Sequence, residues 1–195
     1  MIRKTLSAWA ALALFLASTT GCSEKKHIDR TPMPTIAAPP YACDYIPLRP
    51  IEVMTGVRDP LIRGDFDLRR SSTGMGGCAI YQRTGDKLKV LYVDLSPGGE
   101  LAEVEEHLRG GAKPLPEILP GGKGYYFKDS SSNTNSVYSM LVRDETRIMI
   151  QLEIGAEGRD NAADVVALMK LIAPKLITDA SAASSSPSPS VSAKG

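Results

Sequence analysis

Side chains that could perform chemistry are few in this chain. Its 195 residues include two histidines, His27 and His107, and three cysteines, Cys22, Cys43 and Cys78. A histidine base needs a nucleophile and an orienting carboxylate, and no GxSxG elbow or comparable motif supplies the nucleophile. A solvated histidine near the end of a helix is the simpler interpretation of His107. We therefore predict no catalytic residues and no enzyme.

Two short segments resemble ligand loops and fail on spacing. Residues 129–135 place oxygen side chains at alternate positions, beginning with Asp129, but Met140 stands where a calcium loop needs glutamate. Residues 121–124, with Lys123 among three glycines, lack the spacing and the Ser or Thr of a P-loop. We expect no metal and no cofactor, and we interpret residues 129–135 as a polar turn.

The charge balance argues against nucleic acid as a partner. The chain has 23 basic and 22 acidic residues and a formal net charge of +1. Proteins that bind the phosphate backbone carry a basic patch or stripe. With 43% hydrophobic residues, the chain can form a packed core.

The N-terminus has the parts of an export signal. Arg3 and Lys4 precede an apolar stretch that is too short to span a membrane, and small residues follow it up to Cys22. The sequence before Cys22, Thr-Thr-Gly, resembles a bacterial lipobox, although Thr19 stands where leucine is usual. The resemblance implies that Cys22 carries a lipid that anchors the chain to the cell membrane on its extracytoplasmic face. Ordinary cleavage, with Cys22 in a disulfide, is the alternative.

Once Cys22 is lipidated, Cys43 and Cys78 are left. Outside the cytoplasm two remaining thiols usually pair. No CxxC spacing indicates redox activity. We predict a structural disulfide that ties the first helix segment to the start of the second strand, stabilising the fold by about 3–4 kcal/mol.

Composition divides the chain into four parts. Residues 1–21 are the signal peptide, and residues 22–40 hold the lipidated cysteine and a proline-rich spacer. A globular domain is expected over residues 41–177. Residues 178–195 are rich in Ser, Ala and Pro and predict a disordered tail.

Periodicity and turn residues predict strands and helices within that domain. The expected helices are 49–55, 100–109 and 161–172, the last ending or kinking at Pro174; the expected strands lie around 65–70, at 78–84 and 87–95 as a hairpin, at 125–128, and at 137–143 and 147–154 as a second hairpin.

The two hairpin–helix units resemble each other at an offset of 60 residues. Arg83 matches Arg143, Leu88 matches Ile148, Val90 matches Ile150, and Tyr92 matches Leu152. An internal duplication and the general likeness of such units both explain the matches. Either way we expect an α+β fold, with one antiparallel sheet of five or six strands and helices packed on one face.

One segment calls for a functional explanation. Residues 110–124 form a long loop with five glycines and three prolines, leading into the aromatic run Tyr125-Tyr126-Phe127. Loops of that length in compact domains are often functional. We hypothesise that Lys123, Tyr125 and Tyr126 border a ligand or partner site. The alternative is a disordered crossover with the aromatic rings in the core.

A family resemblance agrees with the envelope location. Cys43-Asp44-Tyr45-Ile46-Pro47, a short helix ending at Thr55-Gly56, and a second cysteine opening a strand resemble an uncharacterised family of actinobacterial lipoproteins with a Cys-Asp motif and a domain of unknown function. The resemblance covers residues 41–177. It implies a lipid-anchored, envelope-facing domain with a disulfide, and it supplies no activity and no catalytic residues.

Three hypotheses of function follow. The first is a non-enzymatic envelope module that binds a protein partner or regulates another envelope system. The second is a lipoprotein that binds a small ligand or glycan, which exposed aromatic rings beside the glycine- and proline-rich loop would favour. The third is a hydrolase with scattered residues, which a cleft of perturbed carboxylates would favour.

Overall fold

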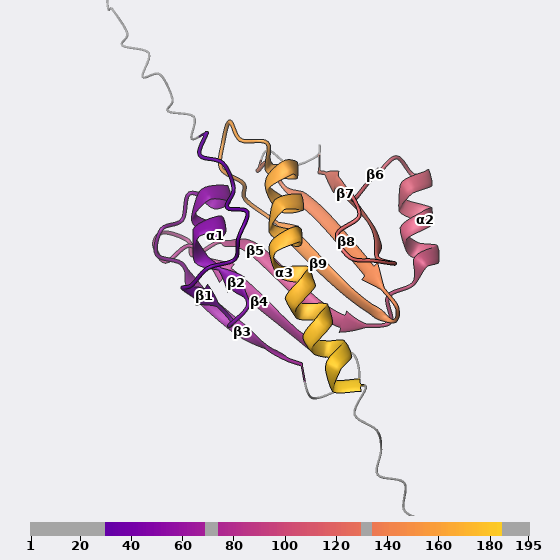
Figure 1. The fold of residues 1–195 in the computed structure, drawn as a ribbon. Coiled ribbons are helices and arrows are strands. Elements are labelled where there is room, and N and C mark those ends of the chain that lie inside the picture. The colour runs from indigo at the N-terminus through magenta and orange to yellow at the C-terminus, as the bar shows by residue number, and fades with distance from the viewer. Residues whose placement is uncertain (1–29, 69–73, 130–133, 185–195) are drawn as a thin grey trace, which may run out of the picture.

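A seven-stranded antiparallel sheet forms the centre of the molecule (Figure 1). The computed structural model describes residues 30–68, 74–129 and 134–184. The strand order is β3-β4-β5-β9-β8-β7-β6. The strands are β3 (Leu61–Asp67), β4 (Met75–Tyr81), β5 (Lys89–Pro97), β6 (Lys113–Pro114), β7 (Lys123–Lys128), β8 (Val137–Arg143) and β9 (Thr146–Leu152). The expected α+β class is confirmed. The predicted count of five or six strands is slightly low, because the two-residue strand β6 carries no recognisable pattern.

Three helices and a small hairpin complete the fold. They are α1 (Leu48–Thr55), α2 (Leu101–Arg109), α3 (Asn161–Ser184) and the two-stranded sheet of β1 (Tyr41–Ala42) and β2 (Ile46–Pro47). Helix α1 agrees with the prediction: Gly56 ends it in the left-handed conformation (φ 75°) and donates its N–H to the carbonyl of Glu52.

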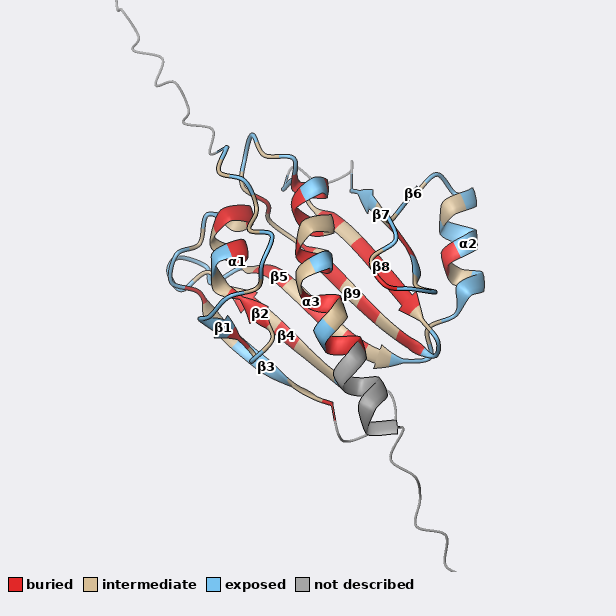
Figure 2. Ribbon diagram, in the orientation of Figure 1, coloured by how far each residue is buried: buried red, intermediate tan, exposed pale blue. Residues whose placement is uncertain are grey.

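The main core lies between α3 and one face of the sheet. Ile148, Ile150 and Leu152 alternate along β9 and are fully buried there, and Figure 2 shows the buried residues along the strands behind α3. Burying each such side chain contributes about 1.5–3 kcal/mol. The core also contains residues of α1 and α3, among them Ile51, Met54, Val165, Leu168, Met169, Ile172, Leu176 and Ile177.

Helix α2 packs on the other face of the sheet, so the expectation that all helices share one face is wrong. Val104 of α2 forms a second core cluster with Tyr125, Met140 and Val142. Met140 and Val142 alternate with Leu141, which belongs to the main core. Strand β8 is therefore apolar on both faces, and both need cover at this end of the sheet.

Helix α3 is longer than predicted. It runs from Asn161 to Ser184, through Pro174 and beyond the expected end at residue 172, and it includes residues 178–184 of the predicted tail. A proline inside a helix costs about 3 kcal/mol, and the apolar stripe that continues past it through Leu176 and Ile177 offsets that cost. Within the described ranges, no helix has both the length and the apolar composition needed to cross a membrane.

The two hairpin–helix units are not equivalent in the fold. Helix α2 follows the β4–β5 hairpin and packs on one face, whereas α3 follows the β8–β9 hairpin and packs on the other. Leu152 lies beneath α3, and Tyr92 pairs with Gln151 on the opposite face. The offset of 60 thus pairs Tyr92 with a residue of the opposite face, but it pairs Val90 with Ile150, which belongs to the same main core.

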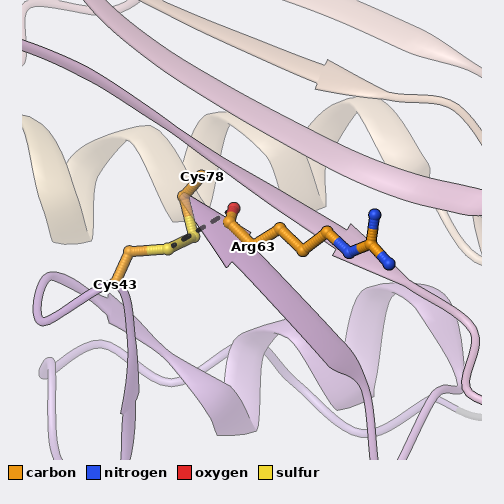
Figure 3. Close-up of a disulfide and its surroundings, with 3 residues drawn as sticks. All are labelled: Cys43, Arg63 and Cys78. Atoms are coloured by element: carbon orange, nitrogen blue, oxygen red, sulfur yellow. Dashed lines mark hydrogen bonds between the residues drawn. A yellow bond between two sulfur atoms is a disulfide. The ribbon is translucent and has the colours of Figure 1, made fainter. Parts of the chain in front are cut away.

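The predicted disulfide between Cys43 and Cys78 is present (Figure 3). The two Cα atoms are 6.0 Å apart, and 35 positions separate them in the sequence. Cys43 and Asp44 both have positive φ (49° and 66°), and Tyr45 donates its N–H to the carbonyl of Ala42, which closes a tight turn of type I′. The Cys43 sulfur lies 3.9 Å from the carbonyl oxygen of Arg63, a contact without a hydrogen bond because an oxidised sulfur carries no proton. The bond thus ties the β1–β2 turn to the buried Cys78 in strand β4.

Part of the predicted spacer belongs to the domain. Met33 packs against the main core, and Arg159 donates from Nη1 to the carbonyl oxygen of Thr31 at 2.8 Å. The same guanidinium forms a bidentate ion pair with Asp164 in the first turn of α3, at 2.7 and 2.8 Å, and the two side chains are only 6% and 7% exposed. Within the predicted spacer, residues 22–40, Thr31 and Met33 are therefore in contact with the domain. The predicted signal peptide, residues 1–21, and Cys22 lie outside the described residues.

Replacing Arg159 with methionine should lower the free energy of unfolding by about 3–5 kcal/mol, because Asp164 would stay buried without its counter-charge. Urea denaturation followed by circular dichroism measures this loss. The double variant Arg159→Met/Asp164→Leu should lose less than the single variant, and Lys170→Met, at an exposed position of α3, should lose little. Equal stability of Arg159→Met and the unchanged chain would contradict the importance of the ion pair.

Candidate binding surface on the open face of the sheet

A row of six side chains crosses the sheet on the face away from α3. Strand register aligns Arg63, Ala79, Tyr92, Gln151, Tyr138 and Phe127, one from each of the strands β3, β4, β5, β9, β8 and β7. Neighbouring strands lie about 4.8 Å apart, so the row spans roughly 24 Å. All six residues are half-buried or exposed.

A second row runs beside the first. It consists of Asp65, Gly77, Asp94 and Met149 and then passes beneath α2 at Met140 and Tyr125. We call the two rows outside the cover of α2, together with Met75, Tyr81, Ser96 and Arg147 on the same face, the open face. A side chain at Gly77 would push the Tyr92 ring aside, because its Cβ would come within 2.6 Å of the Tyr92 hydroxyl.

Hydrogen bonds orient the polar centre of the open face. Arg147 donates from Nε to the Ser96 hydroxyl at 2.9 Å, and Ser96 donates to Asp94 Oδ2 at 2.8 Å. The Tyr92 hydroxyl donates to the other carboxylate oxygen of Asp94 at 3.3 Å. Burial and the negative charge of Asp94 raise the pKa of Tyr92. These side chains are thus held in place before any partner arrives, which reduces the entropy lost on binding.

Cations lie over two tyrosine rings of this face. Lys89 Nζ is 5.3 Å from the centre of the Tyr92 ring and 3.1 Å from a carboxylate oxygen of Glu153. The guanidinium carbon of Arg63 lies 5.6 Å from the centre of the Tyr81 ring. Both distances are within the range of cation–π attraction.

Four nearly parallel aromatic rings mark the border between α2 and the open face. His107 of α2 stacks on Tyr125 with ring centres 4.3 Å apart. Phe127 lies 6.2 Å from Tyr125 and 5.3 Å from Tyr138. Burial, followed by the interaction with Tyr138, raises the pKa of Tyr125, which is 1% exposed.

A groove of about 460 Å³ opens between the end of α2 and this cluster. It is lined by Glu106, His107, Gly110, Gly111, Ala112 and Phe127. Phe127 is 37% exposed. The groove thus offers one open aromatic ring and two polar side chains.

The three residues predicted to border a site do not form one surface. Lys123 is exposed at the start of β7, Tyr125 is buried beneath α2, and Tyr126 is half-buried against the main core. Alternation along β7 places Tyr125 and Tyr126 on opposite faces. Of the aromatic run, Phe127 is the ring that stays exposed.

The segment 110–124 is more ordered than predicted. It contains β6, which pairs with β7 through Lys113 and Pro114. Leu119 is buried, and Leu115 packs against the main core. A side chain at Gly124 would clash with the Met140 carbonyl and with Leu115, so glycine is what lets this segment lie close against the sheet. Its first residues, Gly110 and Gly111, nevertheless line the groove.

Sequence reasoning missed the two residues that define the groove. His107 was expected as a solvated side chain at a helix end, and it is exposed but also stacked on Tyr125. Phe127 is part of the aromatic run 125–127, of which only Tyr125 and Tyr126 were predicted as site residues. Its spacing of two from Tyr125 places both rings on one face and was the available signal.

Some of the residues considered above as possible ligand-binding residues are not described by the structure. His27 and residues 130–133 of the polar turn lie outside them. Among the residues that the structure does describe, no three His, Cys, Asp or Glu side chains come together as metal ligands.

Comparisons with known proteins give no relative: no family model, no curated protein and no solved structure matches the chain. The function of the open face is therefore argued from the residue types, the charges and the shape of that surface.

The raised pKa values of Tyr125, Tyr138 and Tyr92 predict a loss of stability at alkaline pH. The unfolded chain releases phenolic protons near pH 10 while the folded chain retains them, so stability is complete below pH 10 and falls as the pH rises above it. Each such tyrosine contributes a slope of up to about 1.4 kcal/mol per pH unit.

The variant Tyr125→Phe should flatten that slope by about one proton equivalent, as measured by urea denaturation between pH 9 and roughly pH 11. Met75→Leu, at an exposed position without a titrating group, should keep the original slope. An unchanged slope in Tyr125→Phe would show that this phenol does not govern alkaline stability.

Proposed function

We propose that this chain is a lipid-anchored, extracytoplasmic envelope protein whose domain binds a protein partner through the open face, without catalysing a reaction. The observation that carries the proposal is the composition of that face. Its large side chains are Tyr81, Tyr92, Tyr138, Phe127, Met75, Met149, Arg63 and Arg147. Tyr, Phe, Met and Arg are the residue types enriched at protein interfaces.

The distribution of charge supports a protein as the partner. Arg63 and Arg147 share the open face with Asp65 and Asp94, so the surface is not a field of one sign. A polyanion such as nucleic acid would call for such a field. Mixed charges around aromatic and methionine side chains suit a folded partner with a complementary pattern.

The groove beside α2 favours a second candidate function. An exposed ring next to the glycine-rich segment 110–112 is the feature expected of a small-ligand or glycan-binding lipoprotein, and Phe127 provides it. Its volume, about 460 Å³, is within the range of ligand sites. Native mass spectrometry of the exported chain would reveal a retained small molecule as extra mass that is lost on denaturation.

The lipid anchor is proposed from the sequence around Cys22 and agrees with the resemblance to actinobacterial lipoproteins. Replacing Cys22 with alanine should move the exported protein from the membrane fraction to the soluble fraction, because two or three acyl chains hold a protein firmly on a bilayer. Cell fractionation with a specific antibody measures the shift, and Ser23→Ala is the control. A Cys22→Ala chain that still sediments with membranes in high salt would contradict lipid anchoring at this residue.

Site-specific crosslinking in cells tests the partner proposal. A photo-crosslinking amino acid at Gln151, in the middle of the open face, should trap a defined envelope protein. The same amino acid at Lys170, exposed on α3, should not trap it. Met149→Glu should reduce the Gln151 adduct at least tenfold, because it introduces an unpaired charge into the contact.

Met149 is half-buried, so Met149→Glu is expected to fold, and its thermal midpoint serves as the control. The trapped protein, once purified, must also bind the unchanged domain more tightly than the Met149→Glu domain. The same adducts at Gln151 and Lys170, or an adduct insensitive to Met149→Glu, would refute binding through the open face.

A further inference from the structure

We infer that the groove between α2 and β7 receives an aromatic side chain, a tyrosine or a tryptophan, of the protein partner. This inference builds on the proposed function. It names the anchor residue of the partner and the place where it is held.

The wall of the groove contains aromatic rings on which a further ring can pack. Phe127 is 37% exposed and lies nearly parallel to His107, with an angle of 7° between the ring planes and 6.3 Å between the ring centres. Tyr125 and Tyr138 lie at 6.2 and 5.3 Å from it. Aromatic pairs prefer ring centres 4.5–7 Å apart in offset or edge-to-face arrangements. An aromatic ring of the partner would therefore pack onto the existing cluster of four aromatic rings.

The rim of the groove can satisfy one polar group of that ring. His107 and Glu106 are exposed at the last turns of α2 and face the groove from one side. A buried tyrosine O–H or tryptophan N–H needs a hydrogen-bond acceptor, which the Glu106 carboxylate provides. Gly110 and Gly111 line the groove and have no side chains that could fill it.

The number of polar groups favours an aromatic side chain over a sugar. A pyranose carries hydroxyls around its whole edge, and each that is buried without a partner costs about 1–3 kcal/mol. The groove offers two polar side chains, Glu106 and His107, besides backbone. A phenol or an indole has a single polar group on a large apolar ring, so the two polar side chains of the groove are enough to pair with it.

The position of the groove fits an anchor within a larger contact. Phe127 belongs both to the groove and to the first row of the open face, where it is in register with Tyr138. Interfaces gain most of their energy from a few aromatic or arginine side chains in well-packed pockets, surrounded by contacts that exclude water. The open face would supply those surroundings, and the groove would supply the pocket.

A titration with a small probe tests the inference. The full chain with Cys22→Ala, labelled with ¹⁵N, is titrated with N-acetyl-L-tyrosinamide and separately with methyl β-D-glucopyranoside. The tyrosine probe should shift the amide signals of Gly110, Gly111 and Phe127 in a saturable way, with a Kd of about 0.1–10 mM for a ligand of its size. The glucoside should leave those signals in place.

Variants make the result specific. Phe127→Ala and Phe127→Leu should each weaken binding of the tyrosine probe at least tenfold; the leucine variant keeps an apolar side chain and so controls for folding. Lys170→Ala, at an exposed position of α3 outside the open face and the groove, should bind as the unchanged chain does. The inference would be overturned if only the glucoside shifted these signals, or if neither probe did.

The outcome is separable from that of the proposed function. A Gln151 crosslink that is lost in Met149→Glu but unaffected by Phe127→Ala would retain the open face as the binding surface and reject the groove as the anchor site. Loss of the crosslink in both variants supports the two together.

Discussion

The packing of α3 against one face of the sheet is the constraint on which the rest of this structure depends. Ile148, Ile150 and Leu152 of β9 are fully buried on that face beneath the apolar stripe of α3. That stripe is long enough to carry the helix through Pro174, because the burial beyond it outweighs the cost of the proline. Helix α1 and the disulfide-linked turn are assembled on the same side of the sheet. The other face is left with α2 as its only helix among the described residues.

Because α2 is short, it covers only one end of that second face. Met140, Val142 and Tyr125 lie beneath it, while Tyr92, Met149 and Gln151 on neighbouring strands do not. The groove forms where the cover ends, and the four aromatic rings mark the border (Figure 1 places α2 beside β7 and β8). Because α2 covers only part of this face, tyrosine, methionine and arginine side chains remain at the surface there.

The N-terminal segment is held to the domain at two points, and this bears on the proposed anchor. The disulfide fixes Cys43 to β4, and the buried pair of Arg159 and Asp164 fixes Thr31 at the start of α3. From Cys22 to Arg30 are eight residues, which span at most about 29 Å when fully extended. A lipid on Cys22 would therefore keep the α3 N-terminus near the membrane and would leave the domain less freedom than a tether ending at residue 40.

The sequence by itself determined most of the elements and the disulfide, while β6 and the extension of α3 past Pro174 left no local signal. Alternation in β9, the glycine that ends α1, the acids and bases at the ends of α2 and the pairing of Cys43 with Cys78 are all local or compositional signals, because strand and helix periods and capping act within a few residues. Only the tertiary structure decided which face each helix covers, since a sheet apolar on both sides at β8 accepts a helix on either. It also decided that Arg159 reaches back 128 residues to Thr31 and that Phe127, and not Tyr125 or Tyr126, faces the groove beside His107. These contacts join residues that are distant in the chain, and their geometry arises only when the strands take their order in the sheet.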